Sequence, residues 1–118
     1  MSKALLYHNP RWGKSREAVK LLNDNNVDFD IVEYLKDPLL KDEILVLARK
    51  LGKRPKDFIR TSEKDFRDNN IKSIINNDRA LAKAMEGLPK IMERPIFVFG
   101  ENAIIGRPPE NILMLLDK

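Results

Sequence analysis

Three arginines stand in sequence contexts that suit them to bind an anion. Arg94 and Arg107 each directly precede a proline and flank an apolar stretch typical of a strand, and Arg60 follows an apolar segment. Proline holds the residue before it extended, so Arg94 and Arg107 would be fixed at strand ends. From there a planar guanidinium can donate two hydrogen bonds to a carboxylate or a tetrahedral oxyanion. The alternative for each arginine alone is a surface salt bridge.

A second group of cations marks the turn between an apolar stretch, residues 4–7, and the helical pattern that follows it. Arg11, Lys14 and Arg16 lie within six residues there. The first N–H groups of a helix and the positive end of its dipole attract anions, and they disfavour each nearby cation by about 0.3–1 kcal/mol. An anion bound at the turn would offset this unfavourable interaction, so the three cations are weaker candidates for anion binding. The alternative is a solvated basic turn.

Three residues in or beside this turn, His8, Ser15 and Trp12, each admit two interpretations, and Pro95 admits a special backbone geometry. His8 is a polar support at the strand end or a proton carrier. Ser15 has no histidine and carboxylate close in sequence to activate it, so it caps the helix or binds an anion. Trp12 belongs to the core or covers the turn. Pro95 enters an apolar strand and is a candidate for a cis peptide bond, which about 5–6% of X-Pro bonds adopt.

Composition excludes several kinds of chemistry. The chain has no cysteine, which removes disulfides, thiolate metal sites and nucleophilic attack by the protein's own sulfur. A single histidine leaves no metal-binding histidine cluster, so we expect no metal and no resident cofactor. The net charge of +4 is a mild excess that favours small anions over nucleic acid as partners. The sequence has no membrane-crossing stretch or signal-peptide core, so we expect a cytoplasmic protein.

The pattern of apolar and turn residues predicts an α/β sandwich around a mixed sheet. Residues 4–7 suit a strand ended by the turn residues Asn9 and Pro10, and residues 14–22 suit a helix stopped by the polar run 23–26. Alternation over 27–34 predicts a second strand with one dry face. A strand–helix–strand unit of this kind makes a right-handed crossover between parallel strands.

The second half of the chain supplies further helices and a hairpin. Residues 44–51 form an amphipathic pattern closed by Gly52, and 54–87 suggest short helices. Their expected start residues are Pro55, Ser62 and Asp78, and the expected packing stripe is Leu81, Ala84, Met85 and Leu88. Strands over 96–99 and 103–105 flank a short glycine-containing loop, and a helix begins at Pro109. No linker or repeat interrupts the chain, so we expect one domain over 1–118.

Five segments together resemble the glutaredoxin-dependent arsenate reductase family, which is related to Spx-type regulators. They are Tyr7-His8-Asn9-Pro10-Arg11-Trp12-Gly13-Lys14-Ser15-Arg16-Glu17, Val32-Glu33-Tyr34-Leu35-Lys36-Asp37-Pro38, Ile59-Arg60-Thr61, Glu93-Arg94-Pro95-Ile96 and Gly106-Arg107-Pro108-Pro109-Glu110. The resemblance covers essentially the whole chain. It implies a thioredoxin-like fold with a four-stranded sheet in the order 4-3-1-2, an antiparallel third strand and a helical insert between strands 2 and 3.

The resemblance also implies roles for individual residues. In the family, a cysteine in the turn after the first strand attacks arsenate, glutathione joins the cycle, and glutaredoxin resolves the mixed disulfide. Three arginines hold the oxyanion, and by motif they match Arg60, Arg94 and Arg107. The histidine that lowers the cysteine pKa matches His8, the serine beside it matches Ser15, and the proline before the third strand matches Pro95.

One position departs from the family pattern, because Trp12 stands where the nucleophilic cysteine is expected. An indole cannot form an As–S bond or a disulfide, and its bulk would fill part of an oxyanion pocket. Three hypotheses follow. In the first, the chain binds an oxyanion (arsenate, phosphate or sulfate) or glutathione without thiol catalysis of its own. In the second, it reduces arsenate with external thiols from glutathione or glutaredoxin. In the third, it is an interaction protein that, like Spx-type regulators, binds the RNA polymerase alpha subunit.

Overall fold

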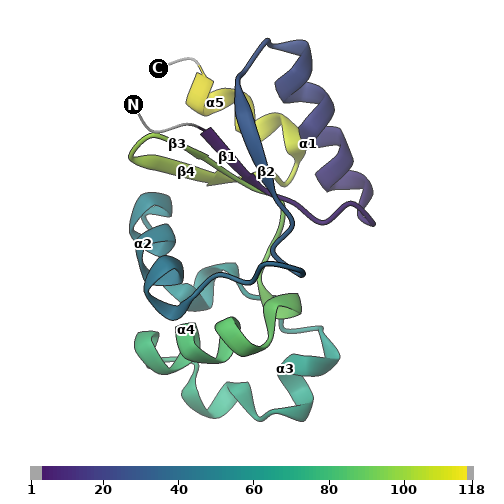
Figure 1. Ribbon diagram of the computed structural model, residues 1–118. Coiled ribbons are helices and arrows are strands. Elements are labelled where there is room, and N and C mark those ends of the chain that lie inside the picture. Colours follow the sequence, from purple (N-terminus) through teal and green to yellow (C-terminus); the bar gives the residue numbers. More distant parts are fainter. Residues whose placement is uncertain (1–3, 117–118) are drawn as a thin grey trace. The chain divides into compact units, whose positions relative to one another are not determined.

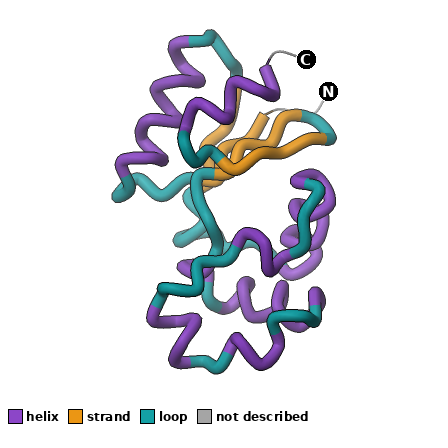
Figure 2. The backbone as a smooth tube through the Cα atoms, turned by 180° about the vertical axis from the view of Figure 1, so that it is seen from behind, coloured by secondary structure: helices purple, strands orange, loops and turns teal. Residues whose placement is uncertain are grey.

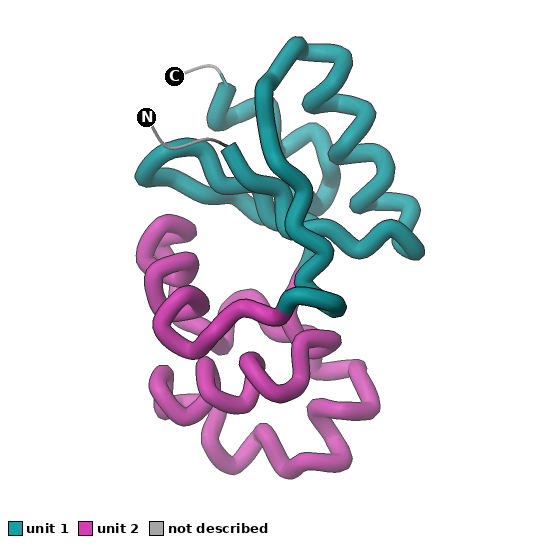
Figure 3. Tube along the Cα trace, viewed as in Figure 1, with its two compact units in different colours: residues 1–37, 94–118 teal, residues 38–93 magenta. Residues whose placement is uncertain are grey.

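The chain divides into two compact units. The computed structural model describes residues 4–116. One unit combines residues 1–37 with 94–118, and the other is the continuous segment 38–93, drawn in teal and magenta in Figure 3. The first unit holds every strand, and the second is helical. The helical segment is thus an insert in an α/β unit, and the expectation of a single domain over 1–118 stays a prediction.

Four short strands form one mixed sheet in the α/β unit. The strands are β1 (Ala4–Tyr7), β2 (Phe29–Val32), β3 (Ile96–Phe99) and β4 (Asn102–Ile105). Their order across the sheet is β2-β1-β3-β4; β1 pairs parallel with β2 and antiparallel with β3, and β3 pairs antiparallel with β4. Read from the other edge, this is the predicted order 4-3-1-2 with its antiparallel third strand, which confirms the α/β thioredoxin-like arrangement.

Helices cover one face of this sheet, as Figures 1 and 2 show. The helix α1 (Gly13–Asp24) joins β1 to β2, and a 3₁₀ turn at Pro109–Ile112 leads into α5 (Leu113–Leu116). Their apolar side chains meet the inward residues of the sheet in one core: Ala4, Leu6, Ala18, Leu22, Phe97, Ile112 and Leu115. The predicted start of the last helix at Pro109 is correct, because proline fits the first position of a helical turn.

The second strand is shorter and more solvent-exposed than the alternation of apolar and polar residues predicted. It spans only Phe29–Val32 of the expected 27–34. Val27 and Phe29 pack against the core, but Ile31 is 46% exposed, so the expected dry face is wrong at that residue. The position of β2 explains this: it is an edge strand with a neighbour on one side only.

The helical unit contains three helices and three 3₁₀ turns. They are α2 (Lys41–Leu51), α3 (Lys64–Asp68), α4 (Asp78–Gly87), η1 (Pro55–Phe58), η2 (Ile71–Ile74) and η3 (Pro89–Ile91). The expected starts at Pro55 and Asp78 are correct, whereas α3 begins two residues after Ser62. Within the predicted stripe of α4, Leu81 and Met85 are buried, and this helix packs on α2.

Candidate functional site

A hydrogen-bonded turn links β1 to α1. The His8 N–H donates to the Val32 carbonyl at 2.9 Å, which ties the end of β1 to the end of β2. The Asn9 side-chain Oδ1 accepts from the Arg11 N–H at 3.1 Å, and the Asn9 carbonyl accepts from the Trp12 N–H at 3.0 Å. Asn9 is buried, so these bonds fix the path of the chain into the helix.

Ser15 holds this turn from inside the helix. It is the third residue of α1, is fully buried, and its Oγ accepts a hydrogen bond from the Asn9 N–H at 3.3 Å. The N-cap position belongs to Trp12, whose side chain makes no capping hydrogen bond. The expectation that Ser15 caps the helix is therefore wrong, because the hydroxyl lies one turn too far along the chain and bonds backward.

The start of α1 keeps a positive electrostatic character. Its first turn contains no acidic residue, and the N-cap side chain makes no capping hydrogen bond, so neither offsets the positive end of the helix dipole. Arg11 and Lys14 are exposed beside it. Arg16 is engaged locally, since its Nη1 donates to the Pro10 carbonyl at 3.0 Å. This terminus can attract an anion, and Arg16 also braces the turn that precedes it.

Arg94 lies buried against the indole of Trp12. Its guanidinium carbon is 3.7 Å from the centroid of the Trp12 ring, close enough for a cation–π contact. Only 2% of Arg94 is exposed, against 37% of Trp12. Arg94 is therefore an interior side chain rather than a surface one. Trp12 covers the guanidinium and remains partly open to solvent, which matches its interpretation as a cover rather than as core.

The Arg94–Pro95 and Arg107–Pro108 peptide bonds are both cis. The first bond leads directly into β3, as the sequence allowed for Pro95, and the second was not anticipated. Arg107 is exposed, and its carbonyl accepts from the Asn111 side-chain amide at 3.2 Å. Arg94 and Arg107 belong to the same unit and flank the β3–β4 hairpin at its two ends.

Arg60 belongs to the helical unit, where it forms an ion pair. Its Nη1 donates to Glu93 Oε1 at 3.1 Å, and its backbone N–H donates to the Ile91 carbonyl at 2.6 Å. The side chains of both partners are mostly buried. Arg60 thus forms a salt bridge, but a mostly buried one rather than the surface salt bridge considered as the alternative. Because Arg60 and the other two arginines belong to different units, their convergence on one anion stays a prediction.

A cavity of about 230 Å³ opens beyond the carboxyl ends of β1 and β2. Its lining comes from the segments that follow the two strands: His8, Asn9, Pro10, Arg11, Glu33, Leu35 and Lys36. Sequence reasoning missed Glu33, Leu35 and Lys36. The parallel pairing of the two strands could have indicated them, since the carboxyl ends of parallel strands meet at one edge and commonly form a binding crevice there.

His8 is the most enclosed titratable group of this cavity. It is 7% exposed, and its Nδ1 has no hydrogen-bond partner among the described residues. Burial lowers the pKa of His8 below its usual value near 6.5; the carboxylate of Glu33 opposes this shift and the cation of Arg16 adds to it. The imidazole is therefore neutral at pH 7, and it can support the strand end without adding a charge.

Residues 4–116 contain no group of three or more His, Asp or Glu side chains placed to hold a metal ion. Over the same residues, every helix is too short or too polar to cross a bilayer.

Comparisons with known proteins agree on one family. The profile of the ArsC family matches residues 7–115. The protein YfgD of Escherichia coli strain K12, which is uncharacterized, is 38% identical over 94% of this chain and 94% of its own length. An arsenate reductase of Haemophilus influenzae is 34% identical over 95% of this chain and 97% of its own. The solved structure of an arsenate reductase from Vibrio cholerae superposes with a TM-score of 0.90 at 34% identity, covering 95% of this chain and 96% of that one.

Proposed function

This chain belongs to the ArsC family, and on that premise we propose that it binds a small tetrahedral oxyanion at the start of α1 without thiol catalysis of its own. The observation that carries the proposal is the guanidinium of Arg94, buried and stacked on Trp12 at the N-cap of α1. A planar guanidinium can donate two parallel hydrogen bonds to an oxyanion, which makes Arg94 a suitable anchor for one. The uncapped helix terminus beside it adds N–H donors.

The absence of cysteine limits the chemistry of such a site. The chain has none, and by motif Trp12 stands where relatives in this family carry the nucleophile. An indole offers no thiolate to attack arsenic and no sulfur to form a disulfide. The family's binding apparatus would then persist as a receptor, with His8 and Ser15 holding the turn rather than activating a nucleophile.

The other cations are included in the proposed site for different reasons. Arg107 shares a unit with Arg94, and by motif Arg60 completes the family's set of three. Arg11, Lys14 and Arg16 contribute charge near the helix terminus. Arsenate, phosphate and sulfate share the tetrahedral shape that such a set recognises. Glutathione, which carries carboxylates and the thiol the chain lacks, is the other candidate ligand.

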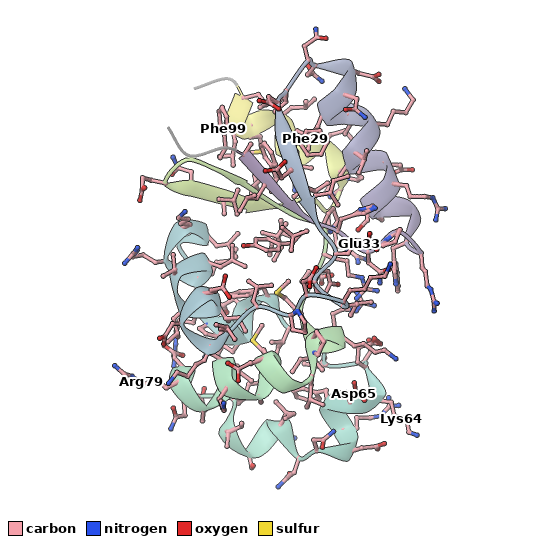
Figure 4. All side chains as sticks on the ribbon, in the orientation of Figure 1. Phe29, Glu33, Lys64, Asp65, Arg79 and Phe99 are labelled. Atoms are coloured by element: carbon pink, nitrogen blue, oxygen red, sulfur yellow. The ribbon has the colours of Figure 1, made fainter. Side chains whose placement is uncertain are left out.

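A stability titration tests the proposal. Unfolding is followed with arsenate, phosphate, sulfate or glutathione added in turn, because a ligand at a hundred times its dissociation constant stabilises the folded state by about 2.7 kcal/mol. We expect at least one of these anions to stabilise the wild type, and Arg94→Lys, which keeps the charge but loses the planar fork, to lose most of that gain. Arg79→Ala is the matched control, since Arg79 is exposed on α4 and outside the proposed site (Figure 4).

The exposed Arg107 supplies a second variant for this titration. Arg107→Ala removes a solvent-exposed side chain, so its folding is not in question if Arg94→Lys proves unstable. The proposal fails if none of the four ligands stabilises the wild type, or if the Arg79→Ala control loses as much stabilisation as the Arg94 and Arg107 variants.

A reductase that borrows its thiols is the first alternative, favoured by the names of the relatives. Reducing arsenate to arsenite takes two electrons, which two external thiols can supply by forming a disulfide while one oxygen leaves as water. The test is arsenite formation with glutathione and glutaredoxin present. We expect background rates for the wild type, and a rise above background in Trp12→Cys if the rest of the family site is intact.

An interaction protein is the second alternative, favoured by the distribution of charge. The segment 38–93 contains 13 Lys or Arg and 9 Asp or Glu, whereas the rest of the chain contains 9 of each, so the helical unit carries the entire net charge of +4. Such a unit suits an acidic partner. Salt-sensitive binding to the RNA polymerase alpha subunit, with no response to any small anion, would favour this alternative.

A further inference from the structure

We propose that the cavity beyond the carboxyl ends of β1 and β2 is a second binding site, which takes the α-amino-carboxylate group of a free amino acid or of a γ-glutamyl peptide. The proposal does not rest on oxyanion binding at α1. It rests on three features of the cavity: a fixed wall, an enclosed imidazole, and charges of both signs within one small volume.

The wall of the cavity is held in place before any ligand arrives. On the β1 side, Asn9 is bonded to Arg11 and to Ser15 through its side chain and backbone. On the β2 side, the Glu33 carbonyl accepts from the N–H groups of Lys36 and Asp37 at 2.9 and 3.0 Å, which closes a turn. Since the polar groups of both turns are bonded internally, little ordering is needed on binding.

The imidazole of His8 supplies one directional group. Its Nδ1 is enclosed and has no partner among the described residues, while the residue itself lines the cavity. A neutral imidazole carries one N–H donor and one bare nitrogen. We infer that the proton is on Nε2 and that Nε2–H is the donor offered to a ligand carboxylate.

The charges of the lining select a ligand that carries both signs. The Glu33 carboxylate suits an ammonium group, while Arg11 and Lys36 suit a carboxylate. Lys36 Nζ lies 3.5 Å from Glu33 Oε1, and its side chain is 77% exposed, so it is free to turn toward a ligand. A simple oxyanion would meet the repulsion of Glu33, and a simple amine would meet the repulsion of the two cations.

The size of the cavity sets the scale of the ligand. Its volume of about 230 Å³ is well above the ~30 Å³ that one water molecule occupies. It is also below the ~300–1,000 Å³ typical of sites for drug-sized molecules. Pro10 and Leu35 give the cavity an apolar side that suits the carbon atoms of such a ligand. An amino-acid group fits these limits.

The single histidine of the chain gives this site its own reporter. The ring-proton resonance of His8 is followed by NMR while glycine, acetate, methylammonium or inorganic phosphate is added. We expect glycine to shift the resonance saturably and to bind at least about tenfold more tightly than acetate or methylammonium, because each of these two lacks one of the two charges. Glu33→Gln is expected to weaken glycine binding about tenfold, whereas Glu17→Gln, on the exposed surface of α1, leaves it unchanged.

A competition titration with glutathione shows whether the ligand is a free amino acid or the γ-glutamyl end of a peptide. Displacement of glycine by glutathione assigns the site to the γ-glutamyl end of that peptide, and no displacement assigns it to a free amino acid; both results uphold the proposal. Equal binding of acetate and glycine overturns it, as does an unchanged glycine affinity in Glu33→Gln. Phosphate bound at the start of α1 also reaches the His8 resonance, because Arg16 acts on His8 and Arg11 lines the cavity. Glu33→Gln therefore separates the two sites, since it should weaken glycine binding and leave the Trp12 fluorescence response to phosphate unchanged.

Discussion

At the scale of single residues, the cation–π contact between Arg94 and Trp12 accounts for the positions of both side chains. Removing a guanidinium from water is unfavourable unless its charge meets compensating groups. The electron-rich face of an indole is one such group, and Trp12 places its ring 3.7 Å from the guanidinium carbon. The edge of a planar guanidinium, which carries its N–H donors, is the part that binds an oxyanion. Stacking of Trp12 on the face is compatible with binding through the edge, as the proposed oxyanion site requires.

Ser15 provides the first prediction at this scale. Replacing Ser15 by alanine leaves the buried N–H of Asn9 without its acceptor, so Ser15→Ala should lower the free energy of unfolding by about 1–2 kcal/mol. Urea denaturation measures this directly. Ser62→Ala, at an exposed position, should change stability by less than about 0.5 kcal/mol. Equal effects of the two substitutions would contradict a structural role for the Ser15 hydroxyl.

His8 provides the second prediction at this scale, which concerns the pH dependence of stability. Burial lowers its pKa in the folded state, so the unfolded chain binds a proton more readily as the pH falls. The stabilising contribution of neutral His8 is therefore complete above about pH 6.5 and decreases below it. Denaturation at pH 7.5, 6.5 and 5.5 should show stability falling by up to about 1.4 kcal/mol per pH unit in the lower interval.

His8→Asn is the variant that isolates this effect. It removes the titrating ring while keeping a polar side chain at the strand end, so its stability should vary less between pH 7.5 and 5.5 than that of the wild type. Carboxylates titrate mostly below this window and affect both proteins alike. A wild-type stability that rises on acidification from pH 6.5 to 5.5 would show that the ring is not held neutral by burial.

At the scale of elements, the sequence predicts best where local chemistry decides the structure. The polar run 23–26 ends α1, with Asn26 at a φ of 59°, and Gly52 ends α2. The hairpin turns at Gly100, whose φ of 65° favours glycine. Each of these outcomes depends on residues within one turn of the chain, so no knowledge of the tertiary structure was needed to predict it.

The sequence predicts less well where distant segments meet. The pairing of Arg60 with Glu93 joins residues 33 positions apart, and the cavity beside His8 joins segments 8–11 and 33–36. Neither follows from periodicity or turn residues. The exposure of Ile31 likewise depends on the edge position of β2, which alternation along one strand does not reveal.

Gly106 supplies a prediction about how β4 leads into Arg107. A Cβ at this position would lie 3.0 Å from Pro95 Cγ and 3.1 Å from Ile112 Cδ1. Because these neighbours are packed in the interior, Gly106→Ala should destabilise the fold by about 1–3 kcal/mol. Thermal unfolding is the measurement. Gly87→Ala, where a Cβ meets nothing within 4 Å, should be neutral or slightly stabilising; a neutral Gly106→Ala would contradict the close packing.

At the scale of the whole molecule, net charge and local charge have separate origins. The α/β unit contains equal numbers of acidic and basic residues, so the cations near α1 are a local feature rather than part of a general excess. The proposed anion binding there depends on the geometry of Arg94 and the helix terminus. The composition alone predicted a preference for small anions, but it could not separate these two contributions, because it does not assign residues to units.

The most direct test of the account uses the only tryptophan in the chain. Trp12 stacks on Arg94, so its fluorescence reports on the arginine that carries the proposal. Titration of the wild type with arsenate or phosphate should change the emission saturably, with an affinity at least about tenfold weaker in Arg94→Lys and unchanged in Arg79→Ala. A flat titration of a folded wild type, or an equal response in Arg94→Lys, would contradict an oxyanion site at the start of α1.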